Sequence, residues 1–182
     1  PAAVLASAME VAMQSRLAVV LFMTLSLVPA MAQHGHADEK LSCEGCPFTL
    51  EAPRDAKVIR GEKTLRVEVD GLDLNATTQR ADFETVVKGL MNVPTWKFDL
   101  GANRFDFQSD EPTRGEYRDV PYAAMAGTAI IGRERLWISW IAFNNPDGQV
   151  VVLLYRIKGN PSPPGLLALY DDITASLRWI KP

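Results

Sequence analysis

Two histidines and two cysteines lie close together in the sequence, as His34-x-His36 and Cys43-x-x-Cys46. Two imidazoles and two thiolates are a ligand set for a soft or borderline metal such as copper or zinc. A Cys-x-x-Cys pair could also serve thiol redox chemistry, but no βαβ pattern follows it and Cys43 opens no helix that would lower its pKa. We expect a local disulfide between Cys43 and Cys46, with no cofactor. The alternative is a metal-binding or thiol-redox protein that uses this N-terminal group.

The rest of the chain contains no histidine, because the sequence has only these two. A Ser-His-Asp or Cys-His nucleophile therefore has no base there, and a site built on several histidines has no ligands. Asp171 and Asp172 are adjacent on a predicted helix, where neighbouring residues do not face each other, so they make a poor acid–base pair. We expect no catalytic residues and a protein that is not an enzyme.

A charged segment at residues 109–119 is a second candidate for function. It precedes the most apolar part of the chain, and binding residues concentrate on polar loops of this kind. Ordinary solvation of a surface loop is the alternative. The candidate binding residues of this loop are Arg114, Glu116, Tyr117, Arg118 and Asp119.

The N-terminal region has the pattern of a secretory signal peptide, placed at residues 1–32, of which 1–12 read as spurious upstream sequence. Arg16 precedes an uncharged apolar run from Leu17 to Pro29, and Ala30-Met31-Ala32 supplies a small-x-small cleavage site. The run is too short to cross a bilayer as a helix. We therefore expect a periplasmic or secreted protein whose mature chain has no membrane span. An oxidising destination also favours the disulfide.

The remaining chain has the length of one domain. Its formal net charge is −3 and its charges are interspersed, so nucleic acid is not an expected partner. Residues 33–47 are polar and punctuated by glycine, which predicts a flexible N-terminal arm. Residues 48–182 are predicted to form a single globular domain.

Hydrophobic periodicity predicts strands and two helices in this domain. Three strands that are apolar on both faces are expected at 123–131, 136–143 and 150–157. Their connections are too short for parallel crossovers, so they form an antiparallel meander. The earlier strands are expected at 48–51, 57–60, 64–69 and 104–108.

The helices are expected at about 78–92, capped by Thr77 or Thr78 and stopped by Pro94, and at about 163–180, capped by Ser162. A sheet that is apolar on both faces must be covered on both faces. The predicted fold class is therefore α+β: a three-layer sandwich of an antiparallel sheet with a central three-strand meander and one helix on each face.

The order of these elements resembles the PsbP/DcrB-like superfamily over about residues 48–180. The resemblance includes the opening Phe48-Thr49-Leu50-Glu51-Ala52-Pro53 and the closing Ile173-Thr174-Ala175-Ser176-Leu177. It implies an exported, non-enzymatic binding or assembly domain that docks another exported or membrane-associated protein, and it carries over no catalytic residues.

Overall fold

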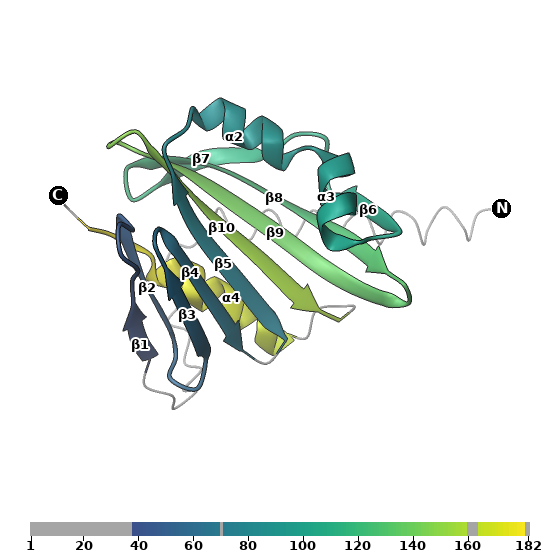
Figure 1. Cartoon of the computed structure of the whole chain (residues 1–182), viewed down its shortest axis with the longest axis horizontal. Helices are drawn as coiled ribbons and strands as arrows, with labels where there is room; N and C mark the ends of the chain where they lie inside the picture. Colours follow the sequence, from purple (N-terminus) through teal and green to yellow (C-terminus); the bar gives the residue numbers. More distant parts are fainter. Residues whose placement is uncertain (1–37, 70, 160–163, 181–182) are drawn as a thin grey trace, which may run out of the picture. The chain divides into compact units, whose positions relative to one another are not determined.

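A long antiparallel meander forms the centre of the fold in the computed structural model, which describes residues 38–69, 71–159 and 164–180. The meander consists of β8 (Val120–Ile131), β9 (Glu134–Asn145) and β10 (Gln149–Lys158), each paired antiparallel with the next (Figure 1). The meander predicted from the sequence is confirmed, and its strands extend a few residues beyond the predicted ends.

Further strands extend the meander on both sides to an eight-stranded sheet. They are β3 (Lys57–Gly61), β4 (Thr64–Val69), β5 (Leu72–Gln79), β6 (Arg104–Phe107) and β7 (Thr113–Tyr117). The order along the sheet is β3-β4-β5-β10-β9-β8-β6, and β7 also pairs with β8. The sequence predicts no strand at β5, because Thr77 and Thr78 have the chemistry of a helix cap. In the structure, buried and partly exposed side chains alternate along this segment as in a strand, and Leu72, Leu74 and Ala76 are buried.

Two short helices replace the first predicted helix at 78–92. They are α2 (Phe83–Leu90) and α3 (Val93–Leu100). Asp82, not Thr77 or Thr78, caps α2: its carboxylate accepts a hydrogen bond from the Thr85 backbone N–H at 2.8 Å, and this bond is the main reason that the pKa of Asp82 is lowered. Pro94 does not stop the helix but lies in the first turn of α3, where a missing N–H costs nothing.

The last helix also differs from its prediction. Helix α4 runs from Pro164 to Ser176, not to 180, and the predicted cap Ser162 lies outside the described residues. The chain then forms β11 (Arg178–Trp179), which pairs with β2 (Phe48–Pro53). The Ser176 hydroxyl accepts a hydrogen bond from the Glu51 backbone N–H at 2.7 Å, so it joins the helix end to β2.

Part of the predicted flexible arm at 33–47 belongs to the fold. Residues 38–41 form β1 (Asp38–Leu41), which pairs with β2 in a three-stranded sheet of order β1-β2-β11. Leu41 and Cys46 are buried in the same hydrophobic core as β2. Although the composition of this segment is polar, the apolar Leu41 and the Cys43–Cys46 pair attach it to the hydrophobic core.

Two hydrophobic cores lie on opposite faces of the large sheet. One contains Trp96, Phe105 and Trp140 beneath α2 and α3, and the other contains Phe48, Leu153 and Tyr155 beneath α4 and the small sheet. Figure 1 shows α2 and α3 in front of the large sheet and α4 behind it. The α+β three-layer sandwich is therefore confirmed. None of the helices in the described ranges is long and apolar enough to cross a membrane.

Candidate functional site: a groove beside helix α2

Helices α2 and α3 leave part of their face of the sheet uncovered. They contact β9, β8 and β6, whereas β3, β4 and β5 lie beside them without a helix above (Figure 1). The side chains that these three strands present on this face are mostly polar or charged, among them Arg66, Asp73, Asn75 and Thr77. Apart from Ile59, which is opposite Arg66 and 46% exposed, such a surface gives a covering helix little apolar area to bury.

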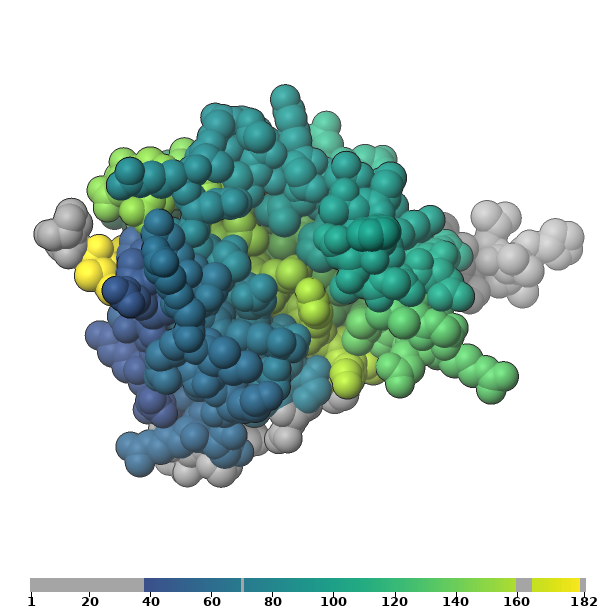
Figure 2. All heavy atoms as spheres, viewed as in Figure 1, coloured from purple at the N-terminus to yellow at the C-terminus, as the bar shows by residue number. Residues whose placement is uncertain are grey.

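A groove follows the boundary between the covered and the uncovered parts. We call it the α2 groove. Its floor is formed by Asn75 and Thr77 of β5 and by Val152 and Leu154 of β10, and its wall by one side of α2. The hollow measures about 460 Å³. Figure 2 shows the yellow-green atoms of β10 at the bottom of a hollow between the blue strands and the teal helices.

The groove has an apolar side and a polar side. Leu154 is only partly buried, as are Val86 and Leu90 of α2, so the apolar side keeps contact with solvent. On the other side Asn75, Thr77 and Gln79 recur at every second residue of β5. The arrangement offers apolar contact and hydrogen-bonding groups in parallel lines, as a site for a polypeptide segment requires.

Gly89 is the part of the α2 wall without a side chain. A methyl group added at this position would meet nothing within 4 Å. Glycine inside a helix is destabilising relative to alanine, and here no close packing explains its presence. The gap lets a ligand approach the backbone of α2.

Substitution of this glycine gives a first testable prediction. Gly89→Ala should raise the free energy of unfolding by about 0.5 to 1 kcal/mol, because alanine has the higher helix propensity and its methyl group meets open space. Gly101 is the matched control, since its added methyl group is also unobstructed but its φ is +62°. Gly101→Ala should lower the free energy of unfolding by about 1 to 2 kcal/mol. Chemical denaturation measures both, and a destabilised Gly89→Ala would contradict the open wall.

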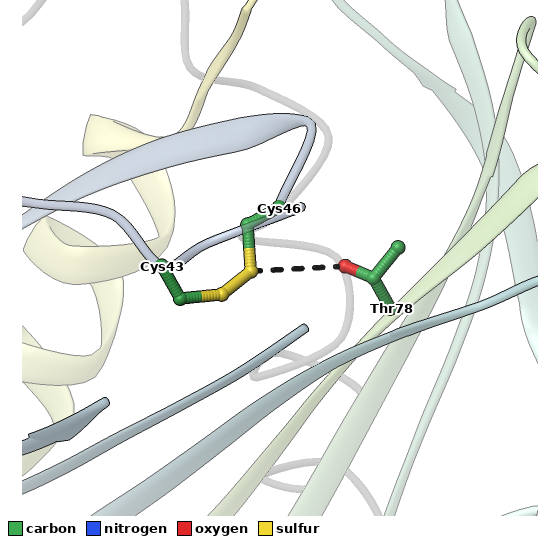
Figure 3. The surroundings of a disulfide bond; sticks show 3 residues. All are labelled: Cys43, Cys46 and Thr78. Carbon is green, nitrogen blue, oxygen red and sulfur yellow. Dashed lines mark hydrogen bonds between the residues drawn. A yellow bond between two sulfur atoms is a disulfide. The ribbon is translucent and has the colours of Figure 1, made fainter. Parts of the chain in front are cut away.

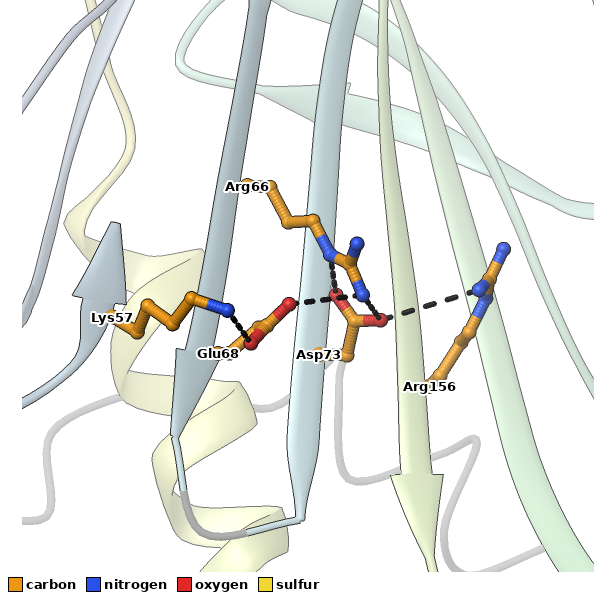
Figure 4. Close-up of polar contacts among 5 residues, drawn as sticks. All are labelled: Lys57, Arg66, Glu68, Asp73 and Arg156. Atoms are coloured by element: carbon orange, nitrogen blue, oxygen red, sulfur yellow. Dashed lines mark hydrogen bonds and ion pairs between the residues drawn. The ribbon is translucent and has the colours of Figure 1, made fainter. Parts of the chain in front are cut away.

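A row of charges crosses the uncovered strands beside the groove. Strand register places Lys57, Glu68, Asp73 and Arg156 opposite one another on β3, β4, β5 and β10. Lys57 Nζ lies 3.0 Å from Glu68 Oε2. Arg66 donates to both oxygens of Asp73, at 3.0 and 2.9 Å, and this hydrogen bonding is the main cause that raises the pKa of Arg66 (Figure 4).

Arg156 is the member of this row whose side chain has no hydrogen bond among the described residues. It forms an ion pair with Asp73, whose oxygen lies 4.0 Å from Nη1, but both oxygens of that carboxylate already accept from Arg66. The Arg156 Nε atom is buried and has no hydrogen-bond partner among the described residues. The guanidinium therefore has donors to spare at the edge of the groove.

The predicted binding loop at 109–119 is partly a strand, and its residues do not gather on one surface. Arg114 lies in β7 and donates to both carboxylate oxygens of Glu84 on α2, at 2.7 and 2.8 Å. That pairing is the main cause that lowers the pKa of Glu84. Arg114 thus joins the sheet to α2.

Tyr117 lies on the side of the sheet opposite to Arg114 and α2. Its hydroxyl donates to the Ala175 carbonyl at the end of α4, at 2.9 Å. Arg118 and Asp119 form the exposed turn between β7 and β8 with φ of 53° and 64°, values that favour glycine or asparagine. The Arg118 guanidinium lies 5.2 Å from the centre of the Tyr117 ring, and Glu116 is exposed.

The cysteines of the predicted metal or redox group are joined to each other. Cys43 and Cys46 form a disulfide with a Cα–Cα distance of 5.3 Å, and the Thr78 hydroxyl donates to Cys46 Sγ at 4.0 Å (Figure 3). His34 and His36 lie outside the described residues. Within the described ranges, no three His, Cys, Asp or Glu residues come together in a way that could hold a metal ion.

The burial of Cys46 leads to a second prediction. Replacing both cysteines by alanine should lower the free energy of unfolding by about 2 kcal/mol, the chain-entropy value for so small a loop. A disulfide on a free arm would leave the melting temperature almost unchanged, but here the loop packs against the core with Cys46 only 7% exposed. Thermal unfolding of the variant and of the reduced parent should agree. An unchanged melting temperature in both would contradict an integral loop.

Sequence patterns alone do not identify the α2 groove. Leu154 has the apolar character of a core residue, and Asn75 and Thr77 fit a glycosylation acceptor or a helix cap as well as a strand. The one local signal is Gly89 inside an amphipathic helix, where glycine is unfavourable.

No protein-family model matches the sequence, and no curated protein matches it. Several solved structures are similar, among them the following two. A solution structure of cyanobacterial PsbP (CyanoP) from Synechocystis sp. PCC 6803 matches 85% of this chain and 98% of its own, with a TM-score of 0.57 and 8% identity. The crystal structure of the Saccharomyces cerevisiae Ran-binding protein Mog1p matches 80% of this chain and 97% of its own, with a TM-score of 0.54 and 7% identity. The PsbP-like fold predicted from the sequence is thus confirmed at the level of the fold.

Proposed function

We propose that this chain is an exported, non-enzymatic accessory domain that docks a partner protein in the α2 groove. The observation that carries the proposal is the half-open sheet face, where partly exposed Leu154 lies beside a helix wall interrupted at Gly89. The similar folds support the same class, since one of them is named for binding another protein. The partner is another exported or membrane-associated protein.

A photo-crosslinking experiment identifies the partner. A benzoyl-phenylalanine replaces Gln79, an exposed residue that lines the groove, or Asp172, an exposed residue of α4 on the opposite side of the sheet. Irradiation in an extract of the source organism should give a discrete adduct from position 79 and none from position 172.

Reconstitution with the purified partner decides the proposal. The identified protein should bind the purified parent chain, and Gly89→Leu should weaken binding about tenfold or more by filling the groove. A Gly89→Leu variant that is folded and binds like the parent would refute the groove as the docking site. Free thiols with one equivalent of bound zinc or copper would instead favour the alternative function at His34, His36 and the two cysteines.

Export is tested separately, by mass spectrometry of the protein recovered outside the cytoplasm. The mature chain should begin at Gln33, because Ala30-Met31-Ala32 is the small-x-small site next to the apolar run. Recovery of the uncleaved chain from the cytoplasm would contradict export. A chain that begins at Asp38 would place cleavage after Gly35-His36-Ala37 and would remove both histidines, which eliminates the metal alternative.

A further inference from the structure

Among the residues that the structure describes, the charges beside the α2 groove do not balance. On the uncovered face Lys57, Arg66 and Arg156 face two described carboxylates, those of Glu68 and Asp73. Glu68 accepts from Lys57 and pairs with Arg66, and Asp73 is held by Arg66 through both oxygens. The positive charge that remains lies at Arg156.

Lys158 adds to this excess. It follows Arg156 by two residues on β10, so its side chain leaves the sheet on the same face, and it has no ion pair in the described structure. A guanidinium with unused donors beside a second cation is a site for a carboxylate, which it can bind through two parallel hydrogen bonds.

Leu154 precedes Arg156 by two residues on the same strand and face. Alternate residues of a strand are separated by about 6.6 Å, so Leu154 and the Arg156 guanidinium are spaced like the alternate side chains of a second extended chain. The polar line of Asn75, Thr77 and Gln79 runs along the neighbouring strand, and none of these side chains has a hydrogen bond in the described structure. Amide and hydroxyl groups in this position suit the backbone of a peptide and not an alkyl chain.

We infer that the α2 groove binds an extended acidic segment of the partner protein, an inference that rests on the proposed function. One apolar side chain of the segment contacts Leu154 in the gap at Gly89. A glutamate or aspartate two residues along the segment binds Arg156, with Lys158 beside it.

A peptide titration followed by NMR tests this inference directly. The probes are short Ser/Thr peptides that carry one leucine and one glutamate, separated by one, two, three or four positions. The two-residue spacing should shift the backbone amides of Gly89, Leu154 and Arg156, and should bind about tenfold more tightly than the same peptide with glutamine. The other spacings should bind no better than the glutamine peptide.

Variants of the protein assign the effect to Arg156. Arg156→Gln should remove the preference for glutamate over glutamine, whereas Arg156→Lys should keep part of it, because the charge remains without the two-donor fork. Arg104→Gln is the matched control: it removes the same charge from β6, outside the groove, where Arg104 is exposed and paired with Asp106. It should leave the preference intact.

Several results would overturn the inference. In the peptide series, these are strongest binding at the four-position spacing of a helix, a lysine peptide that binds as tightly as the glutamate peptide, or no shift of the groove amides with any peptide. In the variants, it is an Arg156→Gln protein that keeps the preference for glutamate over glutamine. A partner that binds Arg156→Gln like the parent but fails to bind Gly89→Leu would refute the acidic segment and leave the docking function standing.

Discussion

Truncating Trp140 to alanine is expected to lower the free energy of unfolding by about 3 to 5 kcal/mol. Trp140 lies on the middle strand of the meander, 0% exposed, in the core beneath α2 and α3. Removal of the indole leaves a large cavity that strands β8 and β10 cannot close, because each is held in register on both sides. Denaturant unfolding of the variant measures the loss.

Two controls separate the burial of the ring from its other properties. Trp140→Phe should lose less than the alanine variant, because it keeps an aromatic ring and removes an indole N–H that has no hydrogen-bond partner in the described structure. Phe98 on α3 is 86% exposed, so Phe98→Ala should stay within about 0.5 kcal/mol of the parent. Equal losses at Trp140 and Phe98 would contradict the division between core and surface.

The second large effect is expected in alkaline solution. Tyr155 of β10 and Tyr170 of α4 are buried where this helix packs on the sheet, and the Tyr155 hydroxyl lies 2.8 Å from Thr174 Oγ1. Because the Thr174 hydroxyl donates to the Tyr170 carbonyl, it accepts from Tyr155, whose proton is therefore held in the network. Burial is the main cause that raises the pKa of Tyr170 to about 12, and it raises the pKa of Tyr155 further still.

These shifts fix the direction of the pH dependence. In the unfolded chain a tyrosine ionises near its ordinary pKa of 10.0, whereas folded Tyr170 keeps its proton to about 12. The unfolded state binds fewer protons between these values, so the contribution of Tyr170 to the free energy of unfolding is constant below this window and falls as the pH rises through it. A difference of this size corresponds to about 2 to 3 kcal/mol for Tyr170 alone, and Tyr155 adds to the loss.

Denaturant unfolding at a series of pH values tests this expectation with Tyr155→Phe as the reference. The variant should lose about 1 kcal/mol at neutral pH, where only the hydrogen bond to Thr174 is removed. Its further decrease in the alkaline window should be smaller than that of the parent. Parallel curves for the two proteins would show that Tyr155 does not contribute to alkaline unfolding.

The meander and the three-layer architecture were predictable because the information is local. Leu136 to Phe143 is apolar on both faces, and the turns at Gly132 and at Asn145 to Gly148 are too short for any pairing except the antiparallel one. The two amphipathic patterns then had to cover the two faces, and the structure places α2 and α4 on opposite sides.

The ends of elements were less predictable, since several residues fit two local structures. Thr77 has the chemistry of a cap but lies in β5, and Pro94 can either end a helix or begin one. Tyr117 belongs to a charged stretch, yet its ring is partly buried and its hydroxyl reaches α4. In each case a contact with a distant segment selected one of the two local possibilities.

The sequence by itself determined the chemistry available to this protein: histidines in the N-terminal segment alone, one pair of cysteines, and a mildly acidic chain with an apolar meander. Only the tertiary structure decided where a partner could bind. The α2 groove exists because β5 pairs with β10, a strand that is far away in the sequence. This pairing places Asn75 beside Leu154 and Asp73 beside Arg156. Register is the physical reason, since a slip of one residue would turn these side chains into the core and bring Leu74 and Tyr155 to the surface.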